Sequence, residues 1–192
     1  LYTAQLATDA DFEYFTRWGG TTWVNQRISA ITNTMNVAYE RDVNITHVIS
    51  QSVIRTSSAD PYTTTDPATL NAQIQTEWNG NAGTRDAIQL FTGREIDGSV
   101  IGRANAIGSI CSAGNGASNC YSQSDFNNNF MSACDLSQHE LGHLWDATPD
   151  ERLVVIPTDD GDCWLLYPRL RHLHNKLFIA TSQGLVAIKS LL

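Results

Sequence analysis

The chain has 192 residues, a length that suits one domain with a sizeable core. Hydrophobic residues make up 42% of it and aromatic residues 9%, which is typical of a globular protein and excludes a disordered one. The formal net charge is -8, without a basic stripe or a run of about 18 apolar residues, so the sequence predicts neither nucleic-acid binding nor a membrane span.

The first two predicted elements are a strand and a helix. Residues 1–9 alternate between polar and apolar side chains, which predicts a strand. Residues 21–42 carry apolar side chains at helical spacing, which predicts an amphipathic helix packed on a core. The predicted apolar stripe consists of Trp23, Val24, Ile28, Ile31 and Met35.

A second strand and a second helix follow. Residues 44–56 are rich in β-branched side chains and predict a strand, in which the single His47 is interpreted as a structural or surface residue. Residues 66–78 predict a helix, because Asp66 is a good capping residue and Pro67 suits the first helical turn.

Two further strands are predicted over residues 86–93 and 99–111. Strands and helices therefore alternate along this part of the chain. Such alternation predicts a layered α/β domain.

The four cysteines are Cys111, Cys120, Cys134 and Cys163. They form no C-x-x-C pair, which argues against a zinc site made of thiolates. Cys111 and Cys120 flank a short Gly-rich stretch that can close easily, so we expect this pair to form a disulfide in an oxidising compartment.

The segment HELGH, residues 139–143, has the spacing of a metal site. His139 and His143 are four residues apart, which places both imidazoles on one face of a helix. Glu140 then lies beside the metal, where it can take a proton from a zinc-bound water. The alternative is a capping box from Ser137 to Glu140, in which Glu140 would satisfy backbone donors at a helix start.

The longer segment HELGHLWDATPD resembles the metzincin signature H-E-x-x-H-x-x-G-x-x-H-D, particularly in its reprolysin (adamalysin-like) branch. Upstream, LATDADFEYFTRWGG is similar to the opening strand and following turn of that branch. LFTGREIDGSVIGRANAIGSIC is similar to the segment that leads into the edge strand beside the substrate cleft. The resemblance covers residues 1–148.

The resemblance implies an α/β (α+β) metzincin-like fold, with a twisted, mostly parallel sheet, packed helices and an active-site helix that includes Gln138 to Leu144. It implies a zinc-dependent endopeptidase in which His139 and His143 bind the metal. In such an enzyme Glu140 is the general base.

The resemblance also implies that a peptide or protein substrate lies along an edge strand. The implied substrate-binding residues are Gly102, Arg103, Ala104 and Asn105. Leu1 opens no recognisable signal peptide. With the predicted disulfide, we expect a secreted or extracellular protein whose signal and pro-segments have been removed.

The chain departs from the signature after its second histidine. Asp146 occupies the Gly position, where it can adopt the left-handed geometry that bends the chain. Pro149 occupies the position of the third histidine and has no donor atom. The Met-turn of the family is also missing, because Met35 and Met131 both precede the motif.

Five residues with suitable donor atoms are the candidates for a third ligand: Asp146, Asp150, Glu151, His172 and His174. His172 and His174 alternate as on a strand, so at most one of them faces the site. The spacing favours none of the five.

Composition changes near residue 148. Both lysines lie after it, asparagine becomes rare and leucine becomes dense. The prediction is therefore a metzincin-like catalytic subdomain over 1–148 and an atypical segment over 149–192. This segment is either a Leu-rich subdomain or a tail of different origin, such as a frameshift or a fusion, and we expect it to pack poorly.

Three functions remain open from the sequence. The first is a zinc endopeptidase, impaired by the missing ligand. The second is a catalytically inactive metzincin-like protein that binds a peptide or partner, and the third is a truncated or frameshifted product. Zinc content with chelator-sensitive cleavage, and the nucleotide sequence around codon 149, would separate them.

Overall fold

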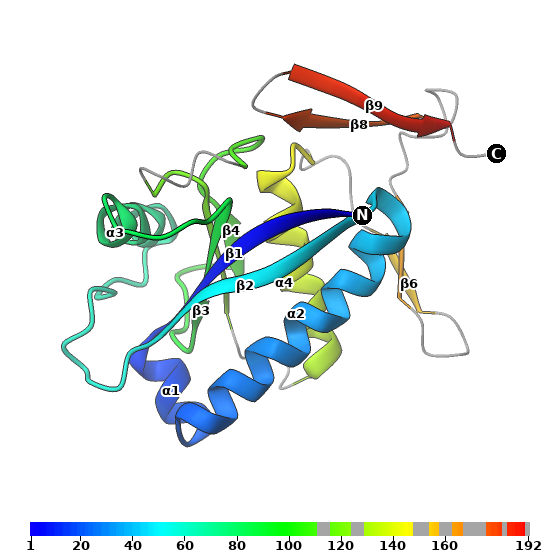
Figure 1. Ribbon diagram of the computed structural model, residues 1–192. Helices are drawn as coiled ribbons and strands as arrows, with labels where there is room; N and C mark the ends of the chain where they lie inside the picture. Colours follow the sequence, from blue (N-terminus) through cyan, green and yellow to red (C-terminus); the bar gives the residue numbers. More distant parts are fainter. Residues whose placement is uncertain are drawn as a thin grey trace.

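The computed structural model describes residues 1–110, 116–123 and 129–147, together with the backbone of four strands beyond them (Figure 1). In chain order the elements are β1 (Tyr2–Ala10), α1 (Phe12–Trp18), α2 (Thr21–Val43), β2 (Ile45–Ile54), α3 (Pro67–Trp78), β3 (Ala87–Thr92), β4 (Gly102–Ala104), β5 (Asn119–Gln123), α4 (Phe130–Leu144), β6 (Val154–Pro157), β7 (Cys163–Leu166), β8 (Lys176–Thr181) and β9 (Gly184–Ser190). The predicted α/β alternation is therefore confirmed.

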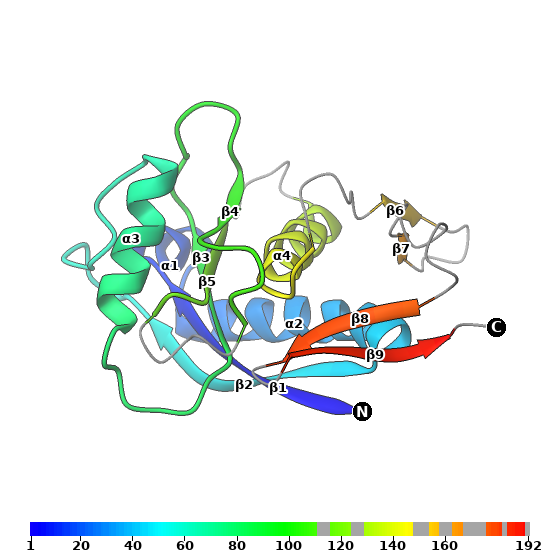
Figure 2. The ribbon, with the colours of Figure 1, turned by 90° about the horizontal axis from the view of Figure 1, so that it is seen from above.

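The central element is a five-stranded sheet in the order β2-β1-β3-β5-β4. Four of its strands are parallel, and β4 pairs antiparallel with β5 at the sheet edge. Helices α2 and α4 cover one face and α3 covers the other (Figure 2). This is the mostly parallel, helix-covered sheet that the sequence predicted.

Two apolar cores lie on the two faces of the sheet. The first joins β1 and β3 to α2 and α4, and includes Ile28, Met35 and Leu141. The second lies beneath α3 and includes Leu70, Trp78 and Tyr121. Because side chains alternate along a strand, one strand supplies residues to both cores.

Helix α3 begins where its predicted capping residue indicated. Asp66 accepts a hydrogen bond from the Thr69 N–H at 2.7 Å and caps α3, with Pro67 in the first turn. Helix α2 buries most of the predicted stripe, but Trp23 is 63% exposed, so its inclusion in the core was wrong. Trp23 directly precedes the buried Val24, and successive helical residues point about 100° apart.

The segment after β1 was interpreted as a turn and is helix α1. Asp11 caps it by accepting from the Tyr14 N–H at 2.8 Å, and Gly19 ends it in the left-handed conformation. The apolar residues of this short helix pack against the first core, where Tyr14 is buried. Capping chemistry at Asp11 was the signal that could have indicated it.

The strand predicted over 99–111 is much shorter than expected. Of the described residues in this range, only Gly102–Ala104 form a strand, and the chain then turns, with Gly108 at a φ of 69°. This turn lets the N–H groups of Gly108 and Ile110 reach carbonyl oxygens at the end of α4. The partner strand β5 was not predicted at all.

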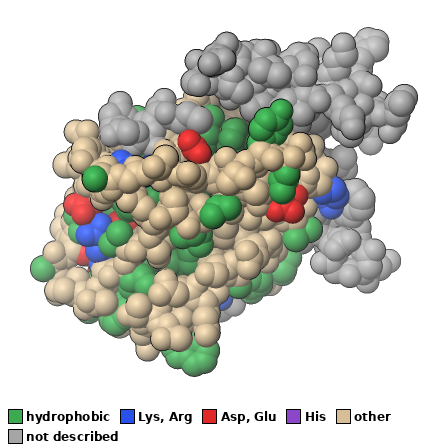
Figure 3. All heavy atoms as spheres, viewed as in Figure 1, with side chains coloured by type: hydrophobic (Ala, Val, Ile, Leu, Met, Phe, Trp, Pro, Cys, Tyr) green, Lys and Arg blue, Asp and Glu red, His purple; other side chains and the backbone are tan. Residues whose placement is uncertain are grey.

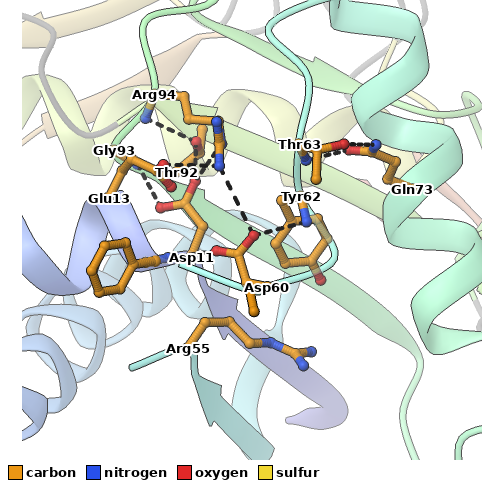
Figure 4. Close-up of polar contacts among 12 residues, drawn as sticks. Asp11, Glu13, Arg55, Asp60, Tyr62, Thr63, Gln73, Thr92, Gly93 and Arg94 are labelled. Atoms are coloured by element: carbon orange, nitrogen blue, oxygen red, sulfur yellow. Dashed lines mark hydrogen bonds and ion pairs between the residues drawn. The ribbon is translucent and has the colours of Figure 1, made fainter. Parts of the chain in front are cut away.

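A cluster of charged side chains lies where β1 and β3 end (Figure 4). Asp11 accepts from the Thr92 hydroxyl at 2.5 Å and from the Gly93 N–H at 2.9 Å. Asp60 accepts from the Phe12 N–H at 2.8 Å. The same cluster contains an ion pair between Arg94 and Glu13 at 2.8 Å. These contacts fasten both the loop after β2 and the end of β3 to the start of α1.

Asp9, nearby on β1, is fully buried. It accepts hydrogen bonds from Arg55, from the Tyr62 hydroxyl at 2.6 Å and from the Trp78 indole at 3.1 Å. These donors offset the cost of burying the carboxylate, so its role is to join β1 to α3.

In the segment after α4, β6 pairs with β7 and β8 with β9, both antiparallel. The predicted loose packing of residues 149–192 concerns side chains outside the described residues.

Among the described residues, no helix is both long and apolar enough to cross a membrane. On the face shown in Figure 3, the described Arg side chains are few and scattered, in line with the acidic composition.

Candidate metal centre and active site

Helix α4 carries the HELGH segment. It begins at Asn129, whose side chain accepts from the Met131 N–H at 2.9 Å, and runs to Leu144. The predicted helix over Gln138–Leu144 is confirmed. Ser137 lies well inside the helix, so the alternative capping box is wrong.

His139 and His143 converge as their spacing predicted. Their Nε2 atoms are 3.1 Å apart and their ring centroids 4.5 Å apart. Two nitrogens bound to one tetrahedral zinc at about 2.0–2.1 Å would be about 3.3 Å apart. The observed separation is thus close to that of two ligands sharing a metal.

Hydrogen bonding determines which nitrogen of His143 is available. Its Nδ1 lies 2.6 Å from the carbonyl oxygen of Ala147. A carbonyl oxygen only accepts, so Nδ1 carries the proton and Nε2 keeps its lone pair. Burial and the nearby His143 lower the pKa of His139, which favours its neutral form as well. The pair therefore fits a divalent metal ion with imidazole ligands.

The end of α4 holds Ala147 in place. Ala147 N–H donates to Gly142 C=O at 3.1 Å, and Asp146 N–H donates to His143 C=O at 3.1 Å. This is a Schellman motif, with Asp146 as its left-handed residue at a φ of 79°. The prediction that Asp146 adopts the bent conformation is confirmed.

Glu140 lies between α4 and the edge strand β4. It is 5% exposed, and its carboxylate accepts a hydrogen bond from the backbone N–H of Ala104. Burial raises the pKa of Glu140 to about 8, although the Ala104 N–H and the charge of Arg103 oppose the rise. A pKa near neutral pH suits a group that takes up a proton and then releases it.

Gly102 allows β4 to approach Glu140 this closely. A Cβ at Gly102 would lie 2.7 Å from the Glu140 Oε1 and 2.8 Å from Leu136. A larger residue at this position would therefore force the Glu140 and Leu136 side chains, or the edge strand, to shift.

The sequence model of metallo-peptidase family M12 matches residues 1–165. The chain belongs to metallopeptidase family M12. Membership implies a peptidase with a catalytic metal, typically zinc, that acts on peptide or protein substrates.

A solved structure has a similar fold. Archaemetzincin (amzA) from Methanopyrus kandleri matches with a TM-score of 0.51 and 14% identity, over 88% of this chain and 92% of that chain. A chain in the structure of a chaperone-substrate complex matches with a TM-score of 0.49 and 13% identity, over 74% of this chain and 23% of that chain. No curated protein matches the chain.

The four residues predicted to bind substrate in this M12 peptidase divide into two groups. Gly102, Arg103 and Ala104 form β4 at the sheet edge. Asn105 is turned to the sheet interior, because its N–H donates to Asn119 C=O at 2.8 Å and its amide donates to Ala117 C=O at 3.1 Å. Asn105 therefore supports the edge strand through these two hydrogen bonds.

Among the described residues, no third His, Cys, Asp or Glu joins His139 and His143. Asp146, one of the five candidates, directs its carboxylate toward Gly108, so this candidate was wrong. The other four candidates lie outside the described residues: Asp150, Glu151, His172 and His174.

The structure does not show the predicted Cys111–Cys120 disulfide. Cys120 is a free thiol on β5 with 0% exposure, and Cys111 lies outside the described residues. The Cys120 side chain packs in the first core, where burial raises the pKa of its thiol well above the usual range. The parallel pairing of β5 with β3, which was not foreseen, is the reason for this burial.

One supporting contact was missed by the sequence interpretation. His47, to which no active-site role was assigned, accepts a hydrogen bond at Nε2 from the Trp145 indole at 3.0 Å. Its Nδ1 lies 3.2 Å from the Asn36 side-chain oxygen. On the same side, the Tyr39 hydroxyl donates to Gln138 C=O at 3.0 Å. Helix α2 and strand β2 thus anchor α4 on either side of the histidines.

Proposed function

We propose that this M12 metallopeptidase is a zinc-dependent endopeptidase of the reprolysin branch of the metzincins. The observation that carries the proposal is the convergence of the His139 and His143 Nε2 atoms, 3.1 Å apart, beside the buried carboxylate of Glu140. Two imidazoles and a basic carboxylate are the groups that hydrolysis of a peptide bond by a metal requires.

Each residue has a distinct role in the proposed reaction. His139 and His143 hold the metal, and Ala147 orients the His143 ring through Nδ1. When bound between these residues, zinc would supply polarisation of the peptide carbonyl and a lowered pKa of water. Glu140 takes a proton at its carboxylate from the attacking water and passes it to the leaving amine.

Strand β4 would position the substrate. Its outer edge is free of strand partners in the five-stranded sheet, and it passes directly beside Glu140. An extended peptide that pairs with this edge brings a backbone carbonyl to the carboxylate and the two histidines. Such backbone pairing orients the peptide bond independently of its side chains.

Zinc titration combined with a cleavage assay tests the proposal. The protein, stripped of metal with a chelator, should bind one zinc by calorimetry and regain cleavage of an unstructured protein such as casein. His143→Ala should lose both. Met131→Ala, a change at a partly exposed residue of the same helix, is the matched control and should retain both.

Two outcomes would contradict these assignments. If Met131→Ala and the native chain bind zinc but neither cleaves casein nor peptides, the endopeptidase proposal is wrong. If His143→Ala binds zinc as tightly as the native chain, the assignment of the metal centre is wrong.

A second function, a catalytically inactive binding protein, is favoured by one observation. The described residues supply two ligands to the metal, whereas catalytic zinc sites ordinarily use three protein ligands. Peptide binding that is unaffected by a chelator, without any cleavage, would support this alternative.

A further inference from the structure

The backbone N–H and C=O groups of successive residues along β4 point to opposite edges of the strand. The Asn105 N–H donates to Asn119 C=O at 2.8 Å, and the Gln123 N–H donates to Ile101 C=O at 2.8 Å. Residues 101 and 105 therefore direct their backbone groups to β5. Because this direction alternates along an antiparallel pair, residue 103 does the same and residues 102 and 104 point outward.

The outward groups belong to Gly102 and Ala104. The hydrogen bond from the Ala104 N–H to Glu140 agrees with this direction. An antiparallel peptide added to the edge would pair with these two residues, with its carbonyl oxygen replacing the Glu140 carboxylate as the acceptor of the Ala104 N–H. The peptide residue opposite Arg103 would then form a pair without hydrogen bonds, in which Cβ atoms lie about 4.5–5.5 Å apart on one face of the sheet.

Arg103 presents a positive charge at that position. It is exposed, and its side chain lies on the α3 face of the sheet, opposite to the face that Gly102 turns to Glu140. Within the described part of the chain, its guanidinium has no hydrogen bond or ion pair. The nearby Asp66 carboxylate is occupied with the cap of α3 at Thr69.

We infer that Arg103 is a specificity-determining residue, which selects a Glu or Asp side chain at the one peptide position directly opposite it. This inference rests on the proposed peptidase function and names the class of substrate for that site. The two neighbouring peptide positions point their side chains to the α4 face, so they are out of reach of Arg103.

A peptide series tests the inference. In an otherwise neutral peptide, Glu replaces Gln at one position at a time, and cleavage by the zinc-loaded protein is measured by kcat/KM, with the cleaved bond identified by mass. An exposed ion pair predicts a preference of about two- to fivefold for Glu over Gln. The preference should occur at one position, be absent at its two neighbours, and weaken in high salt.

Variants of Arg103 identify the source of the preference. Arg103→Lys should keep it, Arg103→Gln should remove it, and Arg103→Glu should invert it in favour of Lys over Gln. Arg17→Glu, at an exposed position of α1, changes the net charge equally and is the matched control that should keep the preference.

Equilibrium binding separates this inference from the peptidase proposal. The same peptides are bound to the Glu140→Gln variant and followed by fluorescence anisotropy. If nothing is cleaved but the Glu preference appears in binding and inverts with Arg103→Glu, the inference holds and the peptidase proposal fails. Cleavage or binding without such a preference, or with one that Arg103→Glu leaves unchanged, overturns the inference. Failure to bind any peptide overturns both.

Discussion

His47 and His143 lie on two sides of the end of α4 and use their ring nitrogens in opposite ways. His47 has both nitrogens engaged inside the protein, Nε2 with the Trp145 indole at 3.0 Å and Nδ1 with Asn36 at 3.2 Å. His143 engages only Nδ1, with Ala147 at 2.6 Å, and turns Nε2 toward His139.

The difference teaches how to separate a structural histidine from a metal ligand. A ring whose two nitrogens both have protein partners has no lone pair left for a metal, and its protonation breaks a contact. A ring that is held by a hydrogen bond at one nitrogen, and whose other nitrogen faces a second imidazole, is oriented to bind a metal. Changes at His47 should therefore alter stability, and changes at the other site should alter zinc binding or catalysis.

The largest effect is expected at Glu140. Glu140→Gln should lower kcat/KM by about 10²–10⁴-fold, because the proton acceptor is lost. Zinc affinity and the free energy of unfolding should change little, since the amide keeps the shape and one acceptor oxygen. Glu40→Gln, at an exposed position of α2, is the control. Equal loss of activity and stability in Glu140→Gln would contradict the distinction between the two sites.

Acid should destabilise the fold through His47. Burial lowers the pKa of His47 from 6.5 to about 4, so between these values the unfolded chain binds a proton that the folded chain does not. Stability is thus lost as the pH falls, by about 2 kcal/mol between pH 7 and pH 5 for this group.

The His47→Gln variant isolates this effect in denaturant titrations. Burial raises the pKa of Asp11 to about 6, which makes that group act in the opposite direction over the same range. The quantity to compare is therefore the difference in the free energy of unfolding between the native chain and the His47→Gln variant at each pH. A difference that does not change from pH 7 to pH 5 would show that His47 titrates alike in both states.

Removing the hydrogen-bond donor to His47 should lower the free energy of unfolding by a similar amount. Trp145→Phe leaves the buried Nε2 without a partner, for an expected loss of about 1–3 kcal/mol in the free energy of unfolding. Trp23→Phe, where the indole is 63% exposed, should change it by less than about 0.5 kcal/mol. Similar losses in both variants would show that aromatic size matters and the hydrogen bond does not.

A third imidazole should strengthen the metal site. Pro149→His places a donor at the third-ligand position of the signature, and we expect zinc to bind at least tenfold more tightly, or about 1.4 kcal/mol. Calorimetric titration of both forms measures this. Equal affinities would mean that another residue already supplies the third ligand or that position 149 does not approach the metal.

The smallest effect is expected at Asp146. Asp146→Gly should raise the free energy of unfolding by about 0.5–1 kcal/mol, because glycine adopts the left-handed conformation at the end of α4 without strain. Asp146→Ala should not raise it. Thermal unfolding of both variants checks this, and a stabilised Asp146→Ala would show that the conformation is not the cause.

Much of the fold was predictable from local sequence. The apolar spacing of α2 and the capping residues of α3 are short-range properties, so the Val24–Met35 stripe located the first helix and Asp66 and Pro67 located the second. The HELGH spacing likewise predicted that two imidazoles meet, because residues four apart lie on one helical face whatever surrounds the helix.

Other features depended on partners distant in sequence. Cys120 is a core thiol because β5 inserts between β3 and β4, and β4 is short because the following turn binds the end of α4. His47 is satisfied by Trp145, which lies 98 residues away. The sequence by itself determined which side chains share a helical face. Only the tertiary structure decided which polar groups are satisfied and which remain available for a metal and a substrate, because burial and pairing are set by residues far apart in the chain.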